Sequence, residues 1–189
     1  MALANITSVY RARLITSIYN KWIKGGEYVL DVGCGTGIVG YELQKNIKIK
    51  VHGCDIDKYL IVPIPFTKMN QVDKLPFENN TFNMVMFSDV LHHVEYENQE
   101  KLIMESLRVA KVVLLFELRP TPIGKLFDYL INKIHNPRMS IPFTYRTESE
   151  WKILFKKMRL KWEIEDVPTP RWYPFSHVAF KLTKKLVKF

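Results

Sequence analysis

The sequence predicts an α/β fold built on a parallel sheet, and three observations in its first third lead to this prediction. Residues 28–32 form a short apolar run with β-branched members, which is typical of a buried strand. Three glycines at alternate positions turn the chain, and a helix is expected to follow from Ile38. A second short strand ends in Asp55. A strand, a glycine turn and a helix in this order place a nucleotide-type pocket at the carboxyl edge of a parallel sheet.

The glycine turn is compatible with two kinds of nucleotide ligand. Residues 35–40, Gly-Thr-Gly-Ile-Val-Gly, fit the GxGxxG pattern of dinucleotide-binding proteins. However, Asp31 stands two residues before the first glycine, and its carboxylate would repel a pyrophosphate in a low-dielectric crevice. S-adenosylmethionine carries no phosphate, and a carboxylate attracts its ammonium and sulfonium groups. The pattern therefore favours this methyl donor, while a dinucleotide and a tight turn without any ligand stay open.

Asp55 supports a nucleoside ligand of either kind. It lies twenty residues after Gly35, at the end of the second strand. An acid at this offset can accept hydrogen bonds from both ribose hydroxyls.

Further sequence blocks follow in a fixed order. Leu75-Pro76-Phe77 and Leu91-His92-His93 come after the glycine turn and after Asp55. With these blocks the chain resembles the class I S-adenosylmethionine-dependent methyltransferases, in the subgroup with D-x-G-x-G-x-G, L-P-F and L-H-H motifs. The resemblance runs from about Tyr28 to Glu117, which is roughly half of the chain.

The resemblance implies a complete architecture. We expect a Rossmann-like, three-layer α/β sandwich with a seven-stranded, mostly parallel sheet whose last strand is antiparallel. Strands 160–167 and 176–183 would form an antiparallel hairpin at the sheet edge. Residues 1–189 would make a single methyltransferase domain, in which an insertion at about 119–146 caps the substrate.

The spacing of apolar residues and the turn signals place the individual elements. Pro63 and Pro65 should reduce the usual crossover helix to a turn near residues 58–61, because proline removes backbone donors. A capping box, Thr147 to Glu150, should start a helix. The remaining helices are expected at 5–22, 98–109 and 124–135, and the remaining strands at 66–69, 82–87 and 111–117.

The resemblance also implies which residues bind the cofactor, S-adenosylmethionine. In the family an aspartate before the L-P-F block usually contacts adenine, and here Gln71 stands in its place. Its side-chain oxygen can still accept a hydrogen bond, and the Val72 N–H can donate to the ring. The full set of expected cofactor-binding residues is Asp31, Gly33, Cys34, Gly35, Gly37, Asp55, Ile56, Gln71, Val72 and Ser88.

Three histidines are the candidate catalytic residues: His93, His92 and His135. A base with a pKa near the operating pH would help where the acceptor is a hydroxyl or an amine. Of the adjacent pair, one histidine should face the site and the other should pack. We expect no metal, because no third ligand with suitable spacing accompanies them. The candidate substrate-binding residues are Tyr10, Arg119, Tyr145 and Arg146.

Composition and charge set the remaining expectations. Cys34 and Cys54 are too few for a disulfide framework and indicate a cytoplasmic protein, and no apolar run approaches the ~20 residues of a membrane span. The net charge is +9, and residues 152–189 hold ten Lys or Arg against three acids. We therefore expect methyl transfer to a small-molecule acceptor. The alternatives are an RNA or polyanion methyltransferase using this basic region, and a cofactor-binding or partner-binding protein without catalysis.

Overall fold

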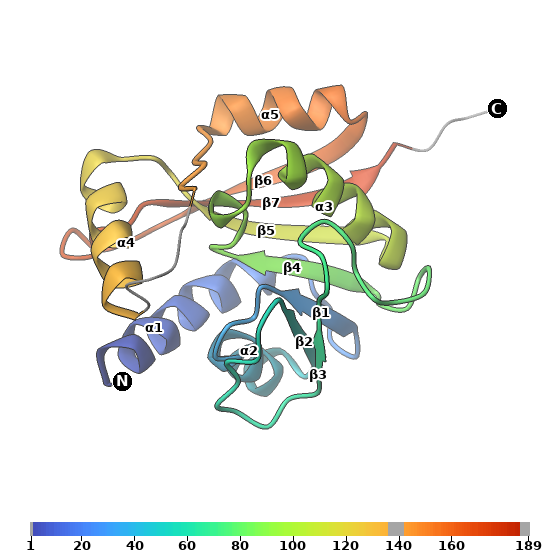
Figure 1. The fold of residues 1–189 in the computed structure, drawn as a ribbon, viewed down its shortest axis with the longest axis horizontal. Helices are drawn as coiled ribbons and strands as arrows, with labels where there is room; N and C mark the ends of the chain where they lie inside the picture. Colours follow the sequence, from blue (N-terminus) through green and yellow to red (C-terminus); the bar gives the residue numbers. More distant parts are fainter. Residues whose placement is uncertain (1, 136–141, 186–189) are drawn as a thin grey trace.

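The computed structural model describes residues 2–135 and 142–185, and it shows one seven-stranded sheet with helices on both faces (Figure 1). The strand order is β3-β2-β1-β4-β5-β7-β6. The strands are β1 (Tyr28–Val32), β2 (Lys50–Asp55), β3 (Phe66–Lys68), β4 (Met84–Ser88), β5 (Val112–Leu118), β6 (Leu160–Val167) and β7 (His177–Lys184). The helices are α1 (Ala2–Tyr19), α2 (Ile38–Ile47), α3 (Tyr96–Val109), α4 (Pro122–His135) and α5 (Glu148–Lys157), with a 3-10 turn η1 (Leu91–His93).

The sheet has the predicted topology. Strands β3, β2, β1, β4 and β5 pair in parallel, and β7 pairs antiparallel with both β5 and β6. The carboxyl ends of the five parallel strands therefore meet at one edge. The mostly parallel sheet with an antiparallel hairpin at its edge is confirmed.

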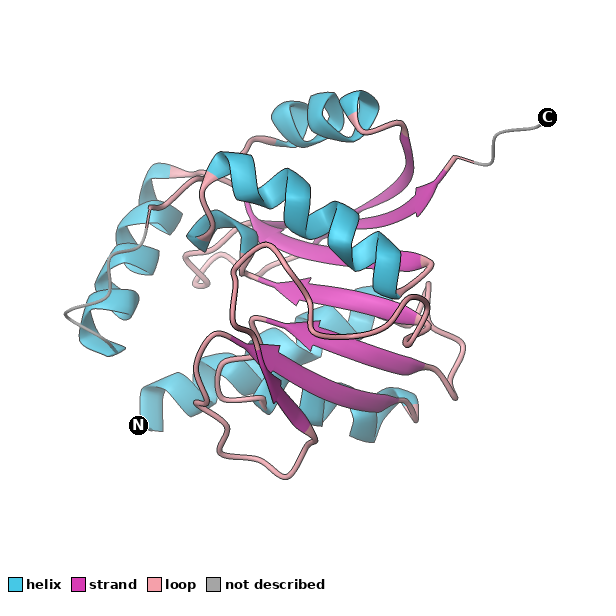
Figure 2. Cartoon of the chain, turned by 45° about the vertical axis from the view of Figure 1, so that its right-hand side comes forward, coloured by secondary structure: helices cyan, strands magenta, loops and turns pink. Residues whose placement is uncertain are grey.

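Successive side chains of the central strands point to opposite faces of the sheet, and they form two separate cores, one on each face. In β4, Val85 and Phe87 pack with residues of α3 and α5, whereas Met84 and Met86 pack with residues of α1 and α2. Figure 2 shows the helices lying on the two sides of the sheet. Because β4 is buried on both faces, it reads as a continuous apolar run rather than an alternating one. The three-layer prediction is confirmed.

The crossover between β2 and β3 contains no helix, as the two prolines predicted. Residues 56–65 instead fold back over the glycine turn, where the Ile61 N–H donates to the Thr36 carbonyl at 3.1 Å. Leu60 and Val62 lie so close to Gly37 that a side chain there would overlap them. This loop therefore covers the part of the turn formed by Thr36 and Gly37.

Element boundaries differ from the predictions by up to three residues. The first helix ends at Tyr19 rather than at Trp22, because the Trp22 and Ile23 N–H groups both return to the Tyr19 carbonyl and close a turn. The predicted capping box is present: Thr147 N–H donates to the Glu150 carboxylate at 2.6 Å, and Glu150 N–H donates back to the Thr147 hydroxyl.

Two smaller expectations concern the cysteines and the membrane. Cys34 and Cys54 are both free and buried. None of the helices in the described part of the chain combines the length and apolar character needed to cross a bilayer.

Candidate active site

The glycine turn between β1 and α2 adopts a backbone that only glycine takes easily. Gly33, Gly35 and Gly37 have φ angles of 71°, 50° and 75°, all in the left-handed region. At Gly33 a β-carbon would lie 2.5 Å from a methyl group of Val90. Val90 therefore leaves no room for a side chain at Gly33, whereas nothing lies within 4 Å of a β-carbon placed at Gly35, so the backbone of the turn is open to a ligand there.

Asp55 fixes this turn to the end of the neighbouring strand. Its carboxylate accepts hydrogen bonds from the Gly35 N–H at 2.8 Å and from the Ile56 N–H at 2.7 Å. Burial raises the pKa of Asp55, while the two backbone N–H groups act in the opposite direction. The acid therefore lies beside the glycine turn at the carboxyl edge, where the sequence predicted a ribose contact.

Asp31 is buried without a cation in direct contact. It is 1% exposed, and its Oδ2 atom has no hydrogen-bond partner. Burial, followed by the nearby Asp55 carboxylate, raises the pKa of Asp31 from 3.8 to about 8, although Arg11 acts to lower it. A positively charged ligand would let this carboxylate ionise at neutral pH.

Asp89 follows β4 at the same edge and pairs with two residues from distant parts of the chain. Its Oδ2 atom lies 3.2 Å from Arg11 Nη1 and 3.2 Å from His177 Nε2. Burial opposes ionisation, but His177 and Arg11 hold the pKa of Asp89 below its usual range. Its φ angle of 58° places it in the left-handed region, which is uncommon outside glycine.

Several buried polar atoms around these carboxylates have no hydrogen-bond partner among the residues that the structure describes. Each such atom costs about 1–3 kcal/mol when it is buried unpaired. Burial, followed by the nearby charges of Asp31, Glu117 and Asp89, raises the pKa of Tyr19 well above its usual range, so its hydroxyl stays protonated. The atoms are Arg11 Nε, Tyr19 Oη, Asp31 Oδ2, Ser88 Oγ, Asp89 Oδ1, His93 Nδ1 and His177 Nδ1. Together with the glycine turn and Asp55, we call these residues the donor half of the site.

The donor half fits S-adenosylmethionine by its chemistry. The ligand's ammonium and sulfonium need carboxylates, and Asp31 and Asp89 each present an unpartnered oxygen. Its carboxylate needs a cation, and Arg11 presents an unpartnered Nε. Its ribose needs an acceptor pair, which Asp55 supplies. A dinucleotide pyrophosphate would instead bring negative charge beside the ionised Asp89 and would offer Asp31 no cation with which to ionise.

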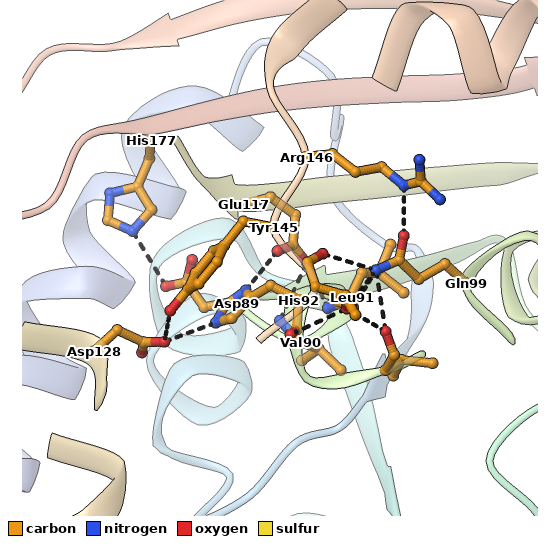
Figure 3. Close-up of polar contacts among 12 residues, drawn as sticks. Asp89, Val90, Leu91, His92, Gln99, Glu117, Asp128, Tyr145, Arg146 and His177 are labelled. Atoms are coloured by element: carbon orange, nitrogen blue, oxygen red, sulfur yellow. Dashed lines mark hydrogen bonds and ion pairs between the residues drawn. The ribbon is translucent and has the colours of Figure 1, made fainter. Parts of the chain in front are cut away.

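His92 belongs to a second group of buried charges (Figure 3). Its Nδ1 lies 2.8 Å from Glu117 Oε2, and its Nε2 lies 3.5 Å from Asp128 Oδ2. Burial lowers the pKa of His92, but the Asp128 and Glu117 carboxylates on its two sides overcome this and raise it to about 10. His92 is therefore a cation held between two carboxylates, and it is too strongly protonated to act as a base at neutral pH.

The same group ties the segment after α4 to the L-H-H turn. Tyr145 donates to Asp128 Oδ2 at 2.6 Å, and its ring stacks on His92 with centroids 5.2 Å apart. The other carboxylate oxygen of Glu117 accepts from the Val90 and Leu91 N–H groups. We call His92, Glu117, Asp128 and Tyr145 the cap half of the site.

His93 differs from its neighbour in charge. Burial, followed by the adjacent His92 cation, lowers the pKa of His93 to about 3, so the ring is neutral. Its Nδ1 has no protein partner, and Phe143 lies edge-on to the ring with centroids 6.1 Å apart. His92 is thus packed in an ion network, whereas the neutral His93 keeps one ring nitrogen unpaired, and the expectation that His93 faces the site stays a prediction.

The other predicted site residues are placed as follows. Tyr10 packs its ring against Trp172 and Tyr173. Arg119 forms ion pairs with Glu148 and Asp166, and Arg146 donates to Gln99 Oε1 at 2.6 Å. Gln71 and Val72 are exposed, and Gln71 bridges to Lys74. His135 ends α4, and its side chain lies outside the described residues.

The ground for expecting no metal was wrong, because the structure brings a third ligand to the histidines. Ligand atoms of His92, His93 and Asp128 lie within 4.8 Å of one another, and the same holds for Asp89, His92 and Glu117. Asp128 comes from α4, more than thirty residues away in sequence. Sequence spacing therefore gave no sign of it.

Sequence reasoning also missed five residues of the site: Arg11, Glu117, Asp128, His177 and, as an ion-pair partner, Asp89. For Asp89 and Glu117 a signal existed, because each lies at the end of a predicted parallel strand. Arg11, Asp128 and His177 come from α1, α4 and β7, and only the folded chain brings these elements to the edge.

Comparisons with known proteins agree with this geometry. Residues 30–112 match the family model described as "Methyltransferase domain". A sterol 24-C-methyltransferase from Gibberella zeae is 29% identical over 120 residues, covering 62% of this chain and 32% of that protein. A ribosomal protein L11 methyltransferase from Thermotoga maritima is 34% identical over 84 residues, covering 44% of this chain and 28% of that protein. The chain thus spans about a third or less of the length of these relatives.

Two solved structures show how far the fold is shared. An S-adenosylmethionine-dependent methyltransferase from Aquifex aeolicus superposes with a TM-score of 0.66 at 17% identity, covering 90% of this chain and 89% of that one. The 1,6-didemethyltoxoflavin-N1-methyltransferase of Burkholderia thailandensis, with bound S-adenosylhomocysteine, gives 0.67 at 14% identity, covering 92% and 78%. The chain therefore has the fold of the class I S-adenosylmethionine-dependent methyltransferases, and its residues 30–112 match the methyltransferase domain family.

Proposed function

We propose that the protein transfers a methyl group from S-adenosylmethionine to a small-molecule acceptor. The observation that carries this proposal is the set of buried, unpartnered polar atoms beside the glycine turn and Asp55. A folded protein tolerates such a concentration of unpaired atoms where a polar ligand completes it. The ligand must offer cations to Asp31 and Asp89 and an anion to Arg11, which the methionine end of the donor does.

The donor supplies an activated methyl group on its sulfonium, so the protein needs chiefly to align the reactants and exclude water. In our proposal Asp55 holds the ribose, and Gln71 with the Val72 N–H contacts the adenine. Asp31, Asp89 and Arg11 orient the methionine end. His93 accepts a hydrogen bond from the acceptor and positions it. A ring with a pKa near 3 is a poor base, so His93 acts by orientation.

A small acceptor is favoured because the segment after α4 covers the two histidines. Phe143 and Tyr145 lie against His93 and His92, and the segment is held there by hydrogen bonds from Thr144 N–H to the His92 carbonyl at 2.8 Å. Proteins of this fold with small acceptors include the didemethyltoxoflavin methyltransferase named above. A covered site suits a small molecule better than a polymer.

The basic carboxyl-terminal region offers less support for an RNA acceptor than its composition suggested. Lys152, Lys157 and Lys181 each form an ion pair, with Glu148, Glu100 and Glu163 respectively. Cations that are paired within the protein contribute less to phosphate binding.

The test is direct binding followed by turnover. Calorimetry should show binding of S-adenosylhomocysteine and no binding of NAD, because only the former lacks a pyrophosphate. Radiolabelled S-adenosylmethionine should then label a low-molecular-weight fraction of a cell extract. NAD binding would contradict the donor assignment. Donor binding without methyl transfer to any fraction would instead favour a cofactor-binding protein without catalysis, and labelling of RNA would move the acceptor to a polymer.

A further inference from the structure

Helix α4 turns its apolar side away from the protein. Five large apolar side chains form this surface, which we call the α4 outer face. Three of them are more than half exposed: Ile123 at 61%, Leu126 at 56% and Ile134 at 79%. The other two are Phe127 and Leu130, both exposed. The side facing the rest of the protein instead carries Gly124 and Asp128, which are buried.

This orientation is the reverse of that in the other amphipathic helices. In α5, Trp151, Leu154 and Phe155 face the core, as an amphipathic surface helix normally does. In α4 the inward position is taken by Asp128, because the buried His92 cation requires it there. An apolar stripe of this size left on the surface marks an interaction site.

The apolar surface continues from α4 onto the loop before β7. A cavity of about 490 Å³ lies between the first turn of α4 and residues 169–176, lined by Ile123 on one side and by Pro170 and Arg171 on the other. Trp172 in this loop is 71% exposed and rests on Tyr10 of α1. Figures 1 and 2 both show α4 at the same end of the molecule as the amino-terminal part of α1.

The charged side chains of α4 and of the loop before β7 that are not buried are positive. Lys125 and Lys133 lie on α4 itself, with their ammonium groups 5.3 Å from the Tyr145 ring and 6.0 Å from the Tyr129 ring, and Arg171 is exposed in the loop. The one carboxylate of α4, Asp128, is buried and paired, and the sequence has no acid between residues 168 and 176. The whole chain carries +9. A second copy of the chain would bring two positive surfaces together, whereas an anionic surface would complement them.

We propose that the α4 outer face and Trp172 dock on the surface of an anionic lipid bilayer. A helix with an apolar face, flanking cations and a nearby exposed tryptophan has the features of an interfacial helix, which lies in the plane of the membrane surface without crossing it. Its cations add electrostatic attraction to anionic headgroups. Since Asp128 lies on the inner face of the same helix, docking places the cap half of the site on the membrane side. The proposal does not depend on methyl transfer.

The test is co-sedimentation with vesicles. The wild-type protein should bind phosphatidylglycerol–phosphatidylcholine vesicles and bind pure phosphatidylcholine vesicles at least about tenfold more weakly. The triple variant Ile123→Ser, Leu126→Ser, Ile134→Ser should lose at least about tenfold in binding to the anionic vesicles, since it removes three apolar side chains from the contact. These side chains are exposed, so the thermal unfolding midpoint should stay close to that of the wild type.

The matched control is Ile153→Ser, which removes an apolar side chain that is 68% exposed on α5 and should leave binding unchanged. Anionic vesicles should also shift the tryptophan fluorescence to the blue, and Trp172→Phe should remove most of that shift, because Trp22 and Trp151 are buried and the half-buried Trp162 packs against Phe155 in the core, away from α4. Equal vesicle binding by the triple variant would overturn the proposal. So would a wild-type dimer that the triple variant converts to monomer while neither protein binds vesicles.

Discussion

The donor half and the cap half of the site share one edge of the sheet, but they treat buried polar groups in opposite ways. In the donor half, Asp31, Asp89 and Ser88 each keep a buried oxygen without a partner. In the cap half, Glu117 accepts three hydrogen bonds, and His92 lies between two carboxylates, although its Nε2 atom is 3.5 Å from Asp128 Oδ2 and has no hydrogen-bond partner among the described residues. The difference indicates that a ligand completes the donor half, whereas most polar groups of the cap half are paired within the protein and hold its residues in place.

The largest expected effect lies in the cap half and concerns stability. Glu117→Ala should lower the free energy of unfolding by about 3–5 kcal/mol, because it leaves the buried His92 cation with one partner fewer and two backbone N–H groups without an acceptor. Urea unfolding measures this. Glu163→Ala, which removes a surface ion pair with Lys181, is the control and should cost at most about 1 kcal/mol. Similar losses for the two variants would contradict a completed cap half.

In the donor half the expected effect is on binding instead. Asp55→Ala should weaken binding of S-adenosylhomocysteine by at least tenfold, which is about 1.4 kcal/mol, because the ribose loses its acceptor. Calorimetry of the folded variant measures this. Asp57→Ala is the matched control, since Asp57 lies two residues away, is exposed and pairs only with groups on the surface. Unchanged affinity in Asp55→Ala would remove the ribose assignment.

The raised pKa of Asp31 predicts how binding depends on pH. In the free protein this pKa is about 8, against 3.8 in the unfolded chain, so the folded state holds a proton that the unfolded state releases. The contribution of Asp31 to the free energy of unfolding is therefore greatest below about pH 4 and declines as the pH rises toward about 8. S-adenosylmethionine, which is a cation, needs Asp31 in its ionised form. The affinity of the protein for this ligand should therefore rise by up to about tenfold per pH unit until about pH 8 and then level off.

Calorimetry in buffers of different ionisation enthalpy checks this, because binding near neutral pH should release close to one proton. Asp31→Asn should bind the ligand more weakly. Its binding should release no proton, and its affinity should not rise with pH. A slope that survives in Asp31→Asn would assign the titration to another group.

The smallest expected effect concerns the adenine contact. Gln71→Asp should bind the cofactor as well as the wild type or better, because a charged acceptor strengthens the hydrogen bond to the adenine amino group by roughly 1 kcal/mol. Gln71 is exposed and makes a single backbone bridge, so the substitution should not disturb the fold. A clear loss of affinity would show that the adenine lies elsewhere, and the assignment of the L-P-F block would have to shift.

Local signals predicted the glycine turn and Asp55, but they missed Arg11 and His177 of the donor half just as they missed Asp128 of the cap half. The positive φ angles at Gly33, Gly35 and Gly37 leave little choice of residue, and Asp55 directly ends a strand. The direction in which α4 faces was not predictable from its apolar spacing. That spacing defines an amphipathic helix, but it does not say which side meets the protein.

By itself, the sequence determined the individual strands and the position of the glycine turn, because these depend on neighbouring residues and on periodicity, and the resemblance added the seven-stranded, mostly parallel sheet. The tertiary structure alone decided the charges and partners of the site. Asp31 keeps its proton, His92 becomes a cation and α4 shows its apolar side to solvent because burial and pairing act between groups that are distant in the chain. Electrostatic energies depend on separation in space and on exclusion of water, and neither can be obtained from the order of residues.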